Sequence, residues 1–135
     1  MCHYIGKKKG RYIANGLRSY SLSLSICPLV IIYLMVLIYT TCKDTKDAVR
    51  LGNEIMNRHL ASAVNLWPIQ MIMRVGTEVK NELGAGMLIK TMEPKIAEIE
   101  ELIESQVGIM PYIGAIDIRR FNRAYREWMA TVIKE

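Results

Sequence analysis

Few residues of this 135-residue chain have the types and spacing that catalysis or metal binding requires. The histidines are His3 and His59, and the cysteines are Cys2, Cys27 and Cys42. His59 falls on the apolar stripe of an expected helix, where a histidine is more often a core residue than a catalyst. The odd number of cysteines and their spacing match neither a disulfide framework nor a zinc motif. No nucleophile set with a histidine base can be assembled, so we predict a non-enzymatic protein without cofactor or metal site.

Residues 84–91, Gly-Ala-Gly-Met-Leu-Ile-Lys-Thr, have some of the residue types of a phosphate-binding loop. A true loop of this kind has glycine directly before the lysine and a strand before the first glycine. Here Ile89 precedes Lys90, and a helical pattern precedes Gly84. The sequence therefore favours a simple helix break at these glycines.

A cluster of arginine and aromatic side chains near the C-terminus is the strongest candidate for binding. We predict an interaction site made of Arg119, Arg123, Arg126, Phe121, Tyr125 and Trp128, with Arg120 beside it. A basic helix with aromatic residues is one signature of nucleic-acid recognition. The three aromatic residues recur at helical spacing, however, which is typical of a side that packs on a core. A protein partner is therefore favoured, and nucleic acid is the alternative.

The positive charge of the chain is confined to its N-terminal part. The formal net charge is +5, and the sequence pI is about 9.2. The five basic residues before position 42 carry no acidic neighbour, whereas from position 43 onward the basic and acidic residues balance. A basic arm at residues 1–20, expected to be flexible, is typical of the cytoplasmic side of a membrane anchor.

The elements that would position these residues begin with an uncharged run from Ser19 to Cys42. At about 1.5 Å per residue, a helix of this length spans roughly 36 Å, enough for a hydrocarbon core of about 30 Å. We therefore predict a membrane-spanning segment at residues 21–42. A cleaved secretory signal, a buried strand or helix of the core, and a non-native extension before Met56 are the alternatives.

The rest of the chain, residues 43–135, has apolar residues at three- and four-residue steps, which predicts helices. Asp44 or Thr45 would cap a helix that runs from Lys46 to Trp67, and a second helix would follow from Pro68. The expected apolar stripes of the last three helices are Ile69, Ile72, Gly76, Val79 and Leu83, then Ile96, Ile99, Leu102, Ile103 and Val107, and then Ile118, Phe121, Tyr125, Trp128 and Val132.

The predicted fold is therefore all-α. It has an N-terminal transmembrane or buried apolar helix, followed by a small helical bundle that ends in an antiparallel αα-hairpin with an acidic and an arginine-rich partner. The corresponding function is that of a single-pass membrane-anchored interaction or assembly protein. Its partners would be membrane lipid and a protein or a second copy bound through the helix seams. A soluble helical nucleic-acid-binding protein, using the basic arm and the Arg119–Arg126 helix, is the alternative.

Overall fold

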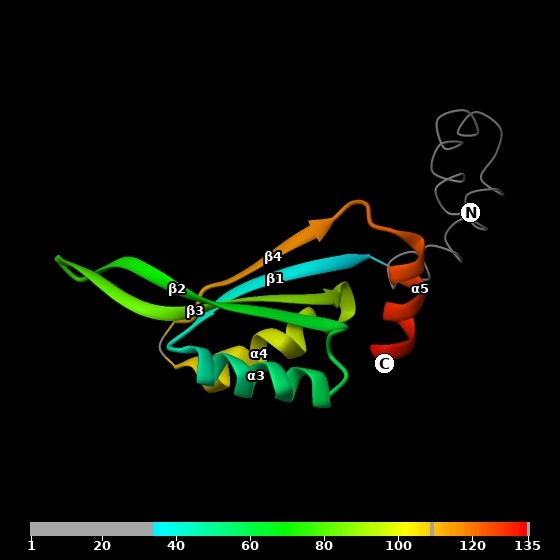
Figure 1. Cartoon of the computed structure of the whole chain (residues 1–135), viewed down its shortest axis with the longest axis horizontal. Coiled ribbons are helices and arrows are strands. Elements are labelled where there is room, and N and C mark those ends of the chain that lie inside the picture. Colours follow the sequence, from blue (N-terminus) through cyan, green and yellow to red (C-terminus); the bar gives the residue numbers. More distant parts are fainter. Residues whose placement is uncertain (1–33, 109, 135) are drawn as a thin grey trace, which may run out of the picture.

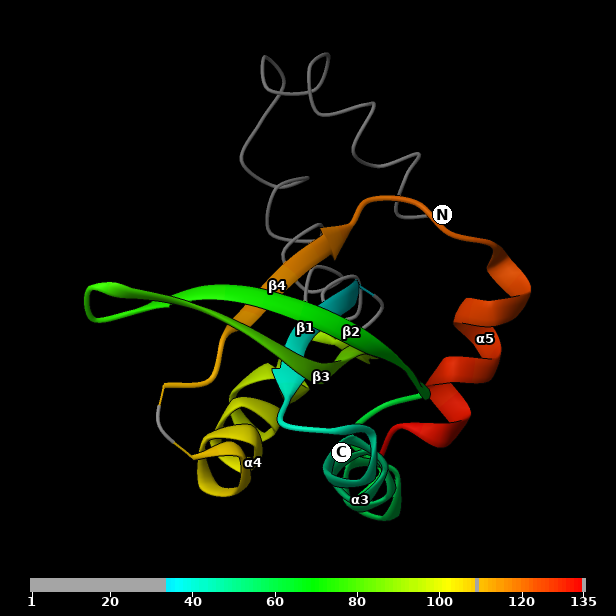
Figure 2. The same cartoon turned by 60° about the vertical axis from the view of Figure 1, so that its left-hand side comes forward.

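The computed structural model describes residues 34–108 and 110–134 and shows an α/β fold (Figure 1). A four-stranded antiparallel sheet has the strand order β2-β3-β1-β4. Helices α3 and α4 cover one face of this sheet, and α5 lies at one end of it (Figure 2). The elements are β1 (Met35–Cys42), α3 (Thr45–Asn57), β2 (Ala63–Val75), β3 (Glu78–Met92), η1 (Glu93–Lys95), α4 (Ile96–Val107), β4 (Ile113–Ile118) and α5 (Arg123–Val132). The all-α prediction is wrong.

Strand β1 is one of the two inner strands of the sheet. It pairs with β3 on one side and with β4 on the other. Its side chains alternate, so that Val36, Ile38 and Thr40 are fully buried on the helix side. A strand buried in this way is rich in valine and isoleucine, which is why its sequence resembles part of an apolar helix. The buried strand, considered as an alternative from the sequence, is what residues 35–42 form.

The predicted membrane anchor is therefore wrong where the structure can be compared with it. Residues 35–42 pair with β3, and residues 35–40 pair with β4 as well, instead of forming the end of a helix. None of the helices in the described ranges is long and apolar enough to cross a bilayer. The predictions of a single-pass membrane localisation and of a membrane-lipid partner depended on this anchor, so they are wrong as well. The predicted arm at residues 1–20, and residues 21–33, lie outside the described residues.

Helix α3 begins where the sequence predicted but ends earlier. The Oδ1 atom of Asp44 accepts a hydrogen bond from the backbone N–H of Asp47 at 2.8 Å, which caps the helix. The helix ends at Asn57, and His59 has a φ of 56° in the turn that follows. The predicted continuation to Trp67 is wrong, because the chain enters β2 at Ala63.

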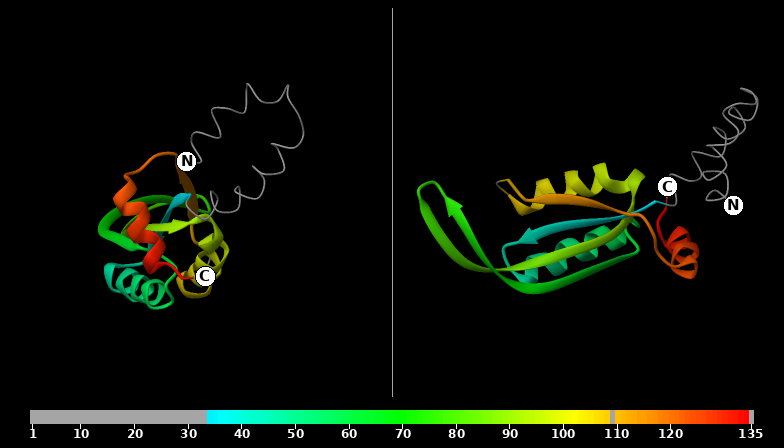
Figure 3. Two further views of the ribbon diagram at one scale, coloured as in Figure 1. Left: turned by 90° about the vertical axis from the view of Figure 1, so that its right-hand side faces the viewer. Right: turned by 90° about the horizontal axis from the view of Figure 1, so that it is seen from above.

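The predicted second helix is instead a long β-hairpin. Strands β2 and β3 pair from Ala63↔Lys90 to Val75↔Glu78, with Gly76 at a φ of 63° in the turn. A left-handed φ of this kind is adopted readily by glycine. The outer part of the hairpin projects beyond the helices and carries little of the core (Figure 3). Exposed apolar side chains on it, which the sequence assigned to a helix seam, include Ile72, Val79 and Leu83.

The last two predicted helices form, but they do not pack as an αα-hairpin, and the last one begins later than predicted. Ile118 is the end of β4, and Arg119 and Phe121 precede α5, which starts at Arg123. Helix α4 forms where its apolar stripe predicted it, and it buries Ile99, Leu102 and Ile103 in the main core beneath the sheet. Strand β4 follows it, so the chain returns to the sheet before α5 begins. A second, smaller apolar cluster joins Met129 of α5 to Met35 at the sheet end. The predicted charge pairing between α4 and α5 therefore does not occur within the described chain.

Candidate functional site

Helix α5 is fixed to the end of the sheet by a polar contact as well as by its apolar residues. The hydroxyl of Ser62 donates to the carbonyl of Lys90 at 3.1 Å. It therefore accepts the hydrogen bond that joins it to the Tyr125 hydroxyl, also at 3.1 Å. Phe121 and Tyr125 pack against the smaller cluster, and the ammonium of Lys90 lies 5.8 Å from the centre of the Tyr125 ring. These two predicted interaction residues thus hold α5 in place.

Trp128, the third aromatic residue of the predicted site, is more accessible. Its ring meets that of Tyr125 edge-on, with a centroid distance of 5.2 Å, and 46% of the residue is exposed. Successive residues of a helix turn by about 100°, so Trp128 and Arg126, two residues apart, lie on nearly opposite sides of α5. The exposed surface of Trp128 is therefore separated from that of Arg126.

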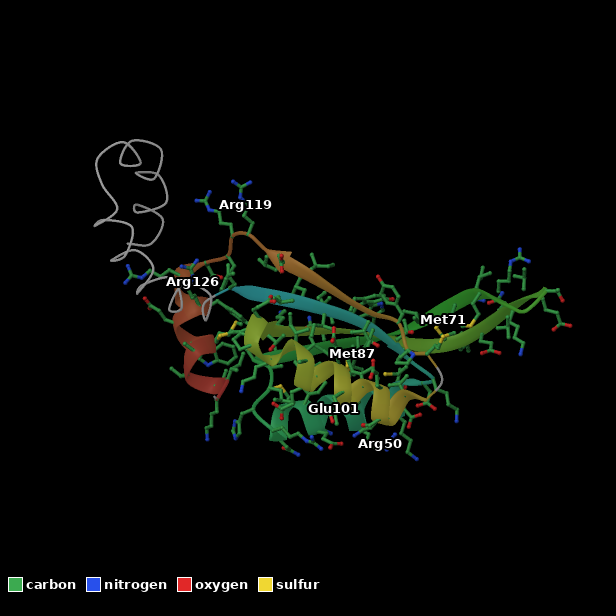
Figure 4. The ribbon with its side chains drawn as sticks, turned by 180° about the vertical axis from the view of Figure 1, so that it is seen from behind. Arg50, Met71, Met87, Glu101, Arg119 and Arg126 are labelled. Atoms are coloured by element: carbon green, nitrogen blue, oxygen red, sulfur yellow. The ribbon has the colours of Figure 1, made fainter. Side chains whose placement is uncertain are left out.

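The arginines of the predicted site lie together at the start of α5. Arg119 and Arg120 lie in the connection that follows β4, and Arg123 and Arg126 lie in the first turns of the helix. All four are exposed. Figure 4 shows Arg119 and Arg126 at the same end of the molecule, far from the tip of the β2–β3 hairpin. The arginines of the predicted site therefore lie at one end of the molecule and at its surface, together as expected from the sequence.

Two of these arginines have their guanidinium groups held by neighbours. The Nε atom of Arg123 donates to the Oε1 atom of Glu127 at 2.7 Å. The guanidinium carbon of Arg126 lies 5.1 Å from the centre of the Phe121 ring, within the range of a cation–π contact. Since Phe121 is itself packed on the sheet end, it places the charge of Arg126 on a fixed support.

An aromatic group on the face of the sheet that α3 and α4 do not cover was missed from the sequence. The ring of Tyr39 stacks on Trp67 at a centroid distance of 6.3 Å and meets Tyr112 edge-on at 6.0 Å. A Cβ atom at Gly86 would lie 3.0 Å from the Trp67 ring, and one at Gly114 would lie 2.6 Å from the Tyr112 hydroxyl. Gly86 and Gly114 have no side chain, so each leaves room for a ring to lie flat on the sheet. A glycine within an apolar strand was therefore the available sequence signal for these aromatic residues.

Cys42, one of the cysteines considered from the sequence, borders a cavity beside α3 and α4. This cavity of about 190 Å³ is also lined by Asp47, Arg50 and Gln106. Burial raises the pKa of the Cys42 thiol, and the nearby carboxylates of Asp47 and Asp44 raise it further. A thiol with a raised pKa stays protonated at neutral pH, and the protonated form is a poor metal ligand. The Cys42 thiol is therefore protonated at neutral pH in the metal-free protein.

The two helices beside this cavity are joined by a carboxylate. Glu54 of α3 accepts hydrogen bonds from the side-chain amide of Gln106 on α4 and from Arg58. The amide, followed by the Arg58 guanidinium, lowers the pKa of Glu54 against the opposing effect of desolvation. This carboxylate is thus used to hold α3 and α4 together. Within residues 34–108 and 110–134, no three histidine, cysteine, aspartate or glutamate side chains converge as a metal site would require.

This arrangement of strands and helices is shared with proteins of known structure. A model of the family described as "CutA1 divalent ion tolerance protein" matches residues 36–132. A relative from Thermococcus kodakarensis, "Divalent-cation tolerance protein CutA", is 30% identical over 99 residues, which cover 73% of this chain and 95% of the relative. A protein of the same name from Archaeoglobus fulgidus is 24% identical over 98 residues, covering 72% of this chain and 96% of that protein.

Solved structures give the same picture of the fold. The structure of periplasmic divalent cation tolerance protein CutA from Archaeoglobus fulgidus superposes with a TM-score of 0.71 at 24% identity, covering 74% of this chain and 99% of that one. CutA1 from Oryza sativa gives a TM-score of 0.72 at 24% identity, covering 76% and 95% of the two chains. The predictions of a membrane-anchored helical assembly protein and of a helical nucleic-acid binder are therefore both wrong. The chain belongs to the CutA1 divalent ion tolerance family.

Proposed function

We propose that this protein acts in the tolerance of divalent metal cations, and that it does so as a non-catalytic protein. The observation that carries the proposal is the continuous match to the CutA1 family model, from the second residue of β1 to the last residue of α5. The match includes the strands, the two helices beneath the sheet and the helix at its end. It therefore covers a whole folded unit instead of a short shared motif.

The curated relatives support the same role. Both are named for divalent-cation tolerance, and the matched region covers 95% and 96% of their lengths. The family is named for tolerance of an ion and not for a reaction, which supports a role without catalysis. These names describe tolerance of the cation by the cell, a role that direct binding of the ion or action through another molecule would serve.

The experiment is a growth test in a bacterial strain that lacks its own CutA1-family gene. The strain would express the full chain and grow in graded concentrations of copper(II), zinc(II) and cadmium(II) salts. We expect a higher inhibitory concentration for at least one of these ions than with the empty vector. The matched control is Ile38→Asp, which places an unpaired charge at a fully buried position and should abolish folding.

No gain in tolerance with folded protein at a verified level would contradict the proposal. Calorimetric titration of the purified full chain with the same ions then separates two mechanisms. Binding of the ion that the strain tolerates indicates direct sequestration. Tolerance without such binding indicates action through another molecule.

A further inference from the structure

We propose that the arginine surface, made of Arg119, Arg120, Arg123 and Arg126, binds an acidic segment of a partner polypeptide. The inference goes beyond the proposed function and does not depend on it. It starts from the four exposed guanidinium groups within eight residues of sequence, at the junction of β4 and α5. Guanidinium groups bind carboxylates through pairs of parallel hydrogen bonds, so such a surface selects carboxylate-bearing partners.

Most of this charge is not neutralised within the protein. In the described part of the chain, Arg123 is the member of the surface that forms an ion pair, with Glu127. The segment before residue 34 contains no acidic residue, so it offers no side-chain carboxylate to the others. Of the residues outside the description, Glu135 alone is acidic, and it follows the opposite end of α5. Arg119, Arg120 and Arg126 are therefore available to an external carboxylate.

The helix that carries Arg123 and Arg126 is packed onto the end of the sheet, and such a preformed support lowers the entropic cost of binding. Met129 is 1% exposed, and Tyr125 is tied to Ser62 by its hydroxyl. Phe121 then holds the guanidinium of Arg126 from below. Figure 4 shows Arg119 extending away from the ribbon at this end of the molecule. The surface thus combines a fixed helix with outward-directed charges.

The exposure of all four arginines favours an extended chain over a small anion. Neither the cavity beside Cys42 nor the one between α3 and β2 is lined by any of the four arginines. A small anion is usually enclosed by its site, whereas an open row of charges suits several carboxylates in succession. The aromatic residues distinguish further between macromolecules. Single-stranded nucleic acids stack their bases on exposed rings beside the basic groups. Here Phe121 and Tyr125 are occupied in packing, and the exposed Trp128 is two residues, about 200° of helical rotation, from Arg126.

The test measures binding of a fluorescein-labelled peptide of alternating glutamate and glycine to the full chain, by fluorescence anisotropy. The surface variant carries Arg119→Glu, Arg120→Glu and Arg126→Glu. The control variant carries Lys46→Glu, Arg74→Glu and Lys80→Glu, which are exposed positions elsewhere and give the same change in net charge. We expect the surface variant to lose at least about ten-fold in affinity and the control to lose about two- to three-fold at most.

Two further measurements sharpen the assignment. Glu127→Gln releases Arg123, so it should tighten peptide binding by about two- to five-fold. Raising the ionic strength from about 0.01 M to about 0.15 M shortens the Debye length from about 30 Å to about 8 Å, so binding should weaken. Circular dichroism would verify that each variant keeps its fold.

Three results would overturn the proposal. The first is wild-type protein that does not bind the peptide, or that binds it as well as the surface variant does. The second is an equal loss in the surface and control variants, which would indicate a general charge effect. The third is tighter binding of an oligothymidine of the same net charge through the same arginines, which would replace the polypeptide with a nucleic acid.

Discussion

The two faces of the sheet differ in how completely they are covered. On the face toward α3 and α4, Ile38, Met87 and Ile89 are all fully buried. On the other face, Ile116 is 54% exposed and Trp67 is 40% exposed, although both lie in the same sheet. The first face is packed as a protein core, whereas in the described chain α5 packs on the second face at one end alone. The comparison indicates that the buried contacts between the sheet and helices α3 and α4 supply most of the stability of the fold. The following predictions test this difference.

The largest effect is expected for Ile38→Ala on the covered face. Removal of a fully buried isoleucine side chain leaves a cavity, and it should lower the free energy of unfolding by about 3–4 kcal/mol. The matched control is Ile116→Ala, in the neighbouring strand but on the open face, which should cost less than about 1 kcal/mol. Urea unfolding followed by circular dichroism measures both. Equal losses would show that the two faces contribute alike.

A smaller loss is expected where the open face does pack closely. Gly86→Val would bring a side chain within 3.0 Å of the Trp67 ring, so the ring must lift from the sheet. We expect a loss of about 1–3 kcal/mol from this overpacking. In the presence of Trp67→Ala, the same glycine substitution should cost much less. Independent, additive losses would contradict the close contact between the ring and the glycine.

At the covered end of the open face, Tyr125→Phe removes the hydroxyl that donates to Ser62. The Ser62 hydroxyl keeps its own bond to the Lys90 carbonyl, so a single hydrogen bond is lost. The expected decrease in unfolding free energy is about 0.5–1.5 kcal/mol. Thermal unfolding of the two proteins side by side measures it, and an unchanged midpoint would show that α5 is held by its apolar residues alone.

The smallest effect concerns the thiol at the edge of the covered face, and it appears at high pH. Because the pKa of Cys42 is raised in the folded state, its contribution to stability is complete below the ordinary thiol pKa of about 8.5. It is lost as the pH rises toward the folded-state pKa, since the unfolded chain releases the proton more readily. Cys42→Ser, in a background with Cys2→Ser and Cys27→Ser, should therefore flatten the stability profile between pH 8 and 10. A profile unchanged by Cys42→Ser would contradict the role of burial.

Local signals in the sequence were sufficient for the start of α3 and for α4, but not for the end of α3, which lies at Asn57 instead of Trp67. Asp44, one of the two predicted caps, caps α3, and α4 occupies the predicted apolar stripe, because a cap and a one-sided stripe are properties of neighbouring residues.

The strands were not found, for two different reasons. Strand β1 is buried on the helix side and half-buried on the other, so its residues run together as one apolar segment. In the outer hairpin, Ile69, Met71 and Met73 of β2 are half-buried on one face, whereas β3 is exposed from Glu78 to Leu83. Because the exposed positions also carry apolar residues such as Ile72, the sequence does not show the apolar–polar alternation typical of a half-buried strand.

The candidate site divides in a similar way. Phe121 and Tyr125 pack on the smaller cluster as the apolar pattern predicted, although Phe121 and Arg119 precede the helix instead of belonging to it. Trp128, which the same pattern placed on the packed side, is 46% exposed. Whether the exposed arginines form an interaction site is untested and stays a prediction. The aromatic group of Tyr39, Trp67 and Tyr112 could not be assembled from the sequence, because its members come from three separate segments that only the strand register brings together.

The central claim is that residues 35–42 form an inner strand of the sheet on which both faces are built. Amide hydrogen exchange of the full chain, followed by mass spectrometry, tests it most directly. The claim predicts that residues 36–40, paired on both sides, exchange among the slowest of the chain, and that residues 72–79 at the hairpin tip exchange among the fastest. Exchange of residues 36–40 as rapid as that of the hairpin tip would contradict the inner strand and the comparison of the two faces that rests on it.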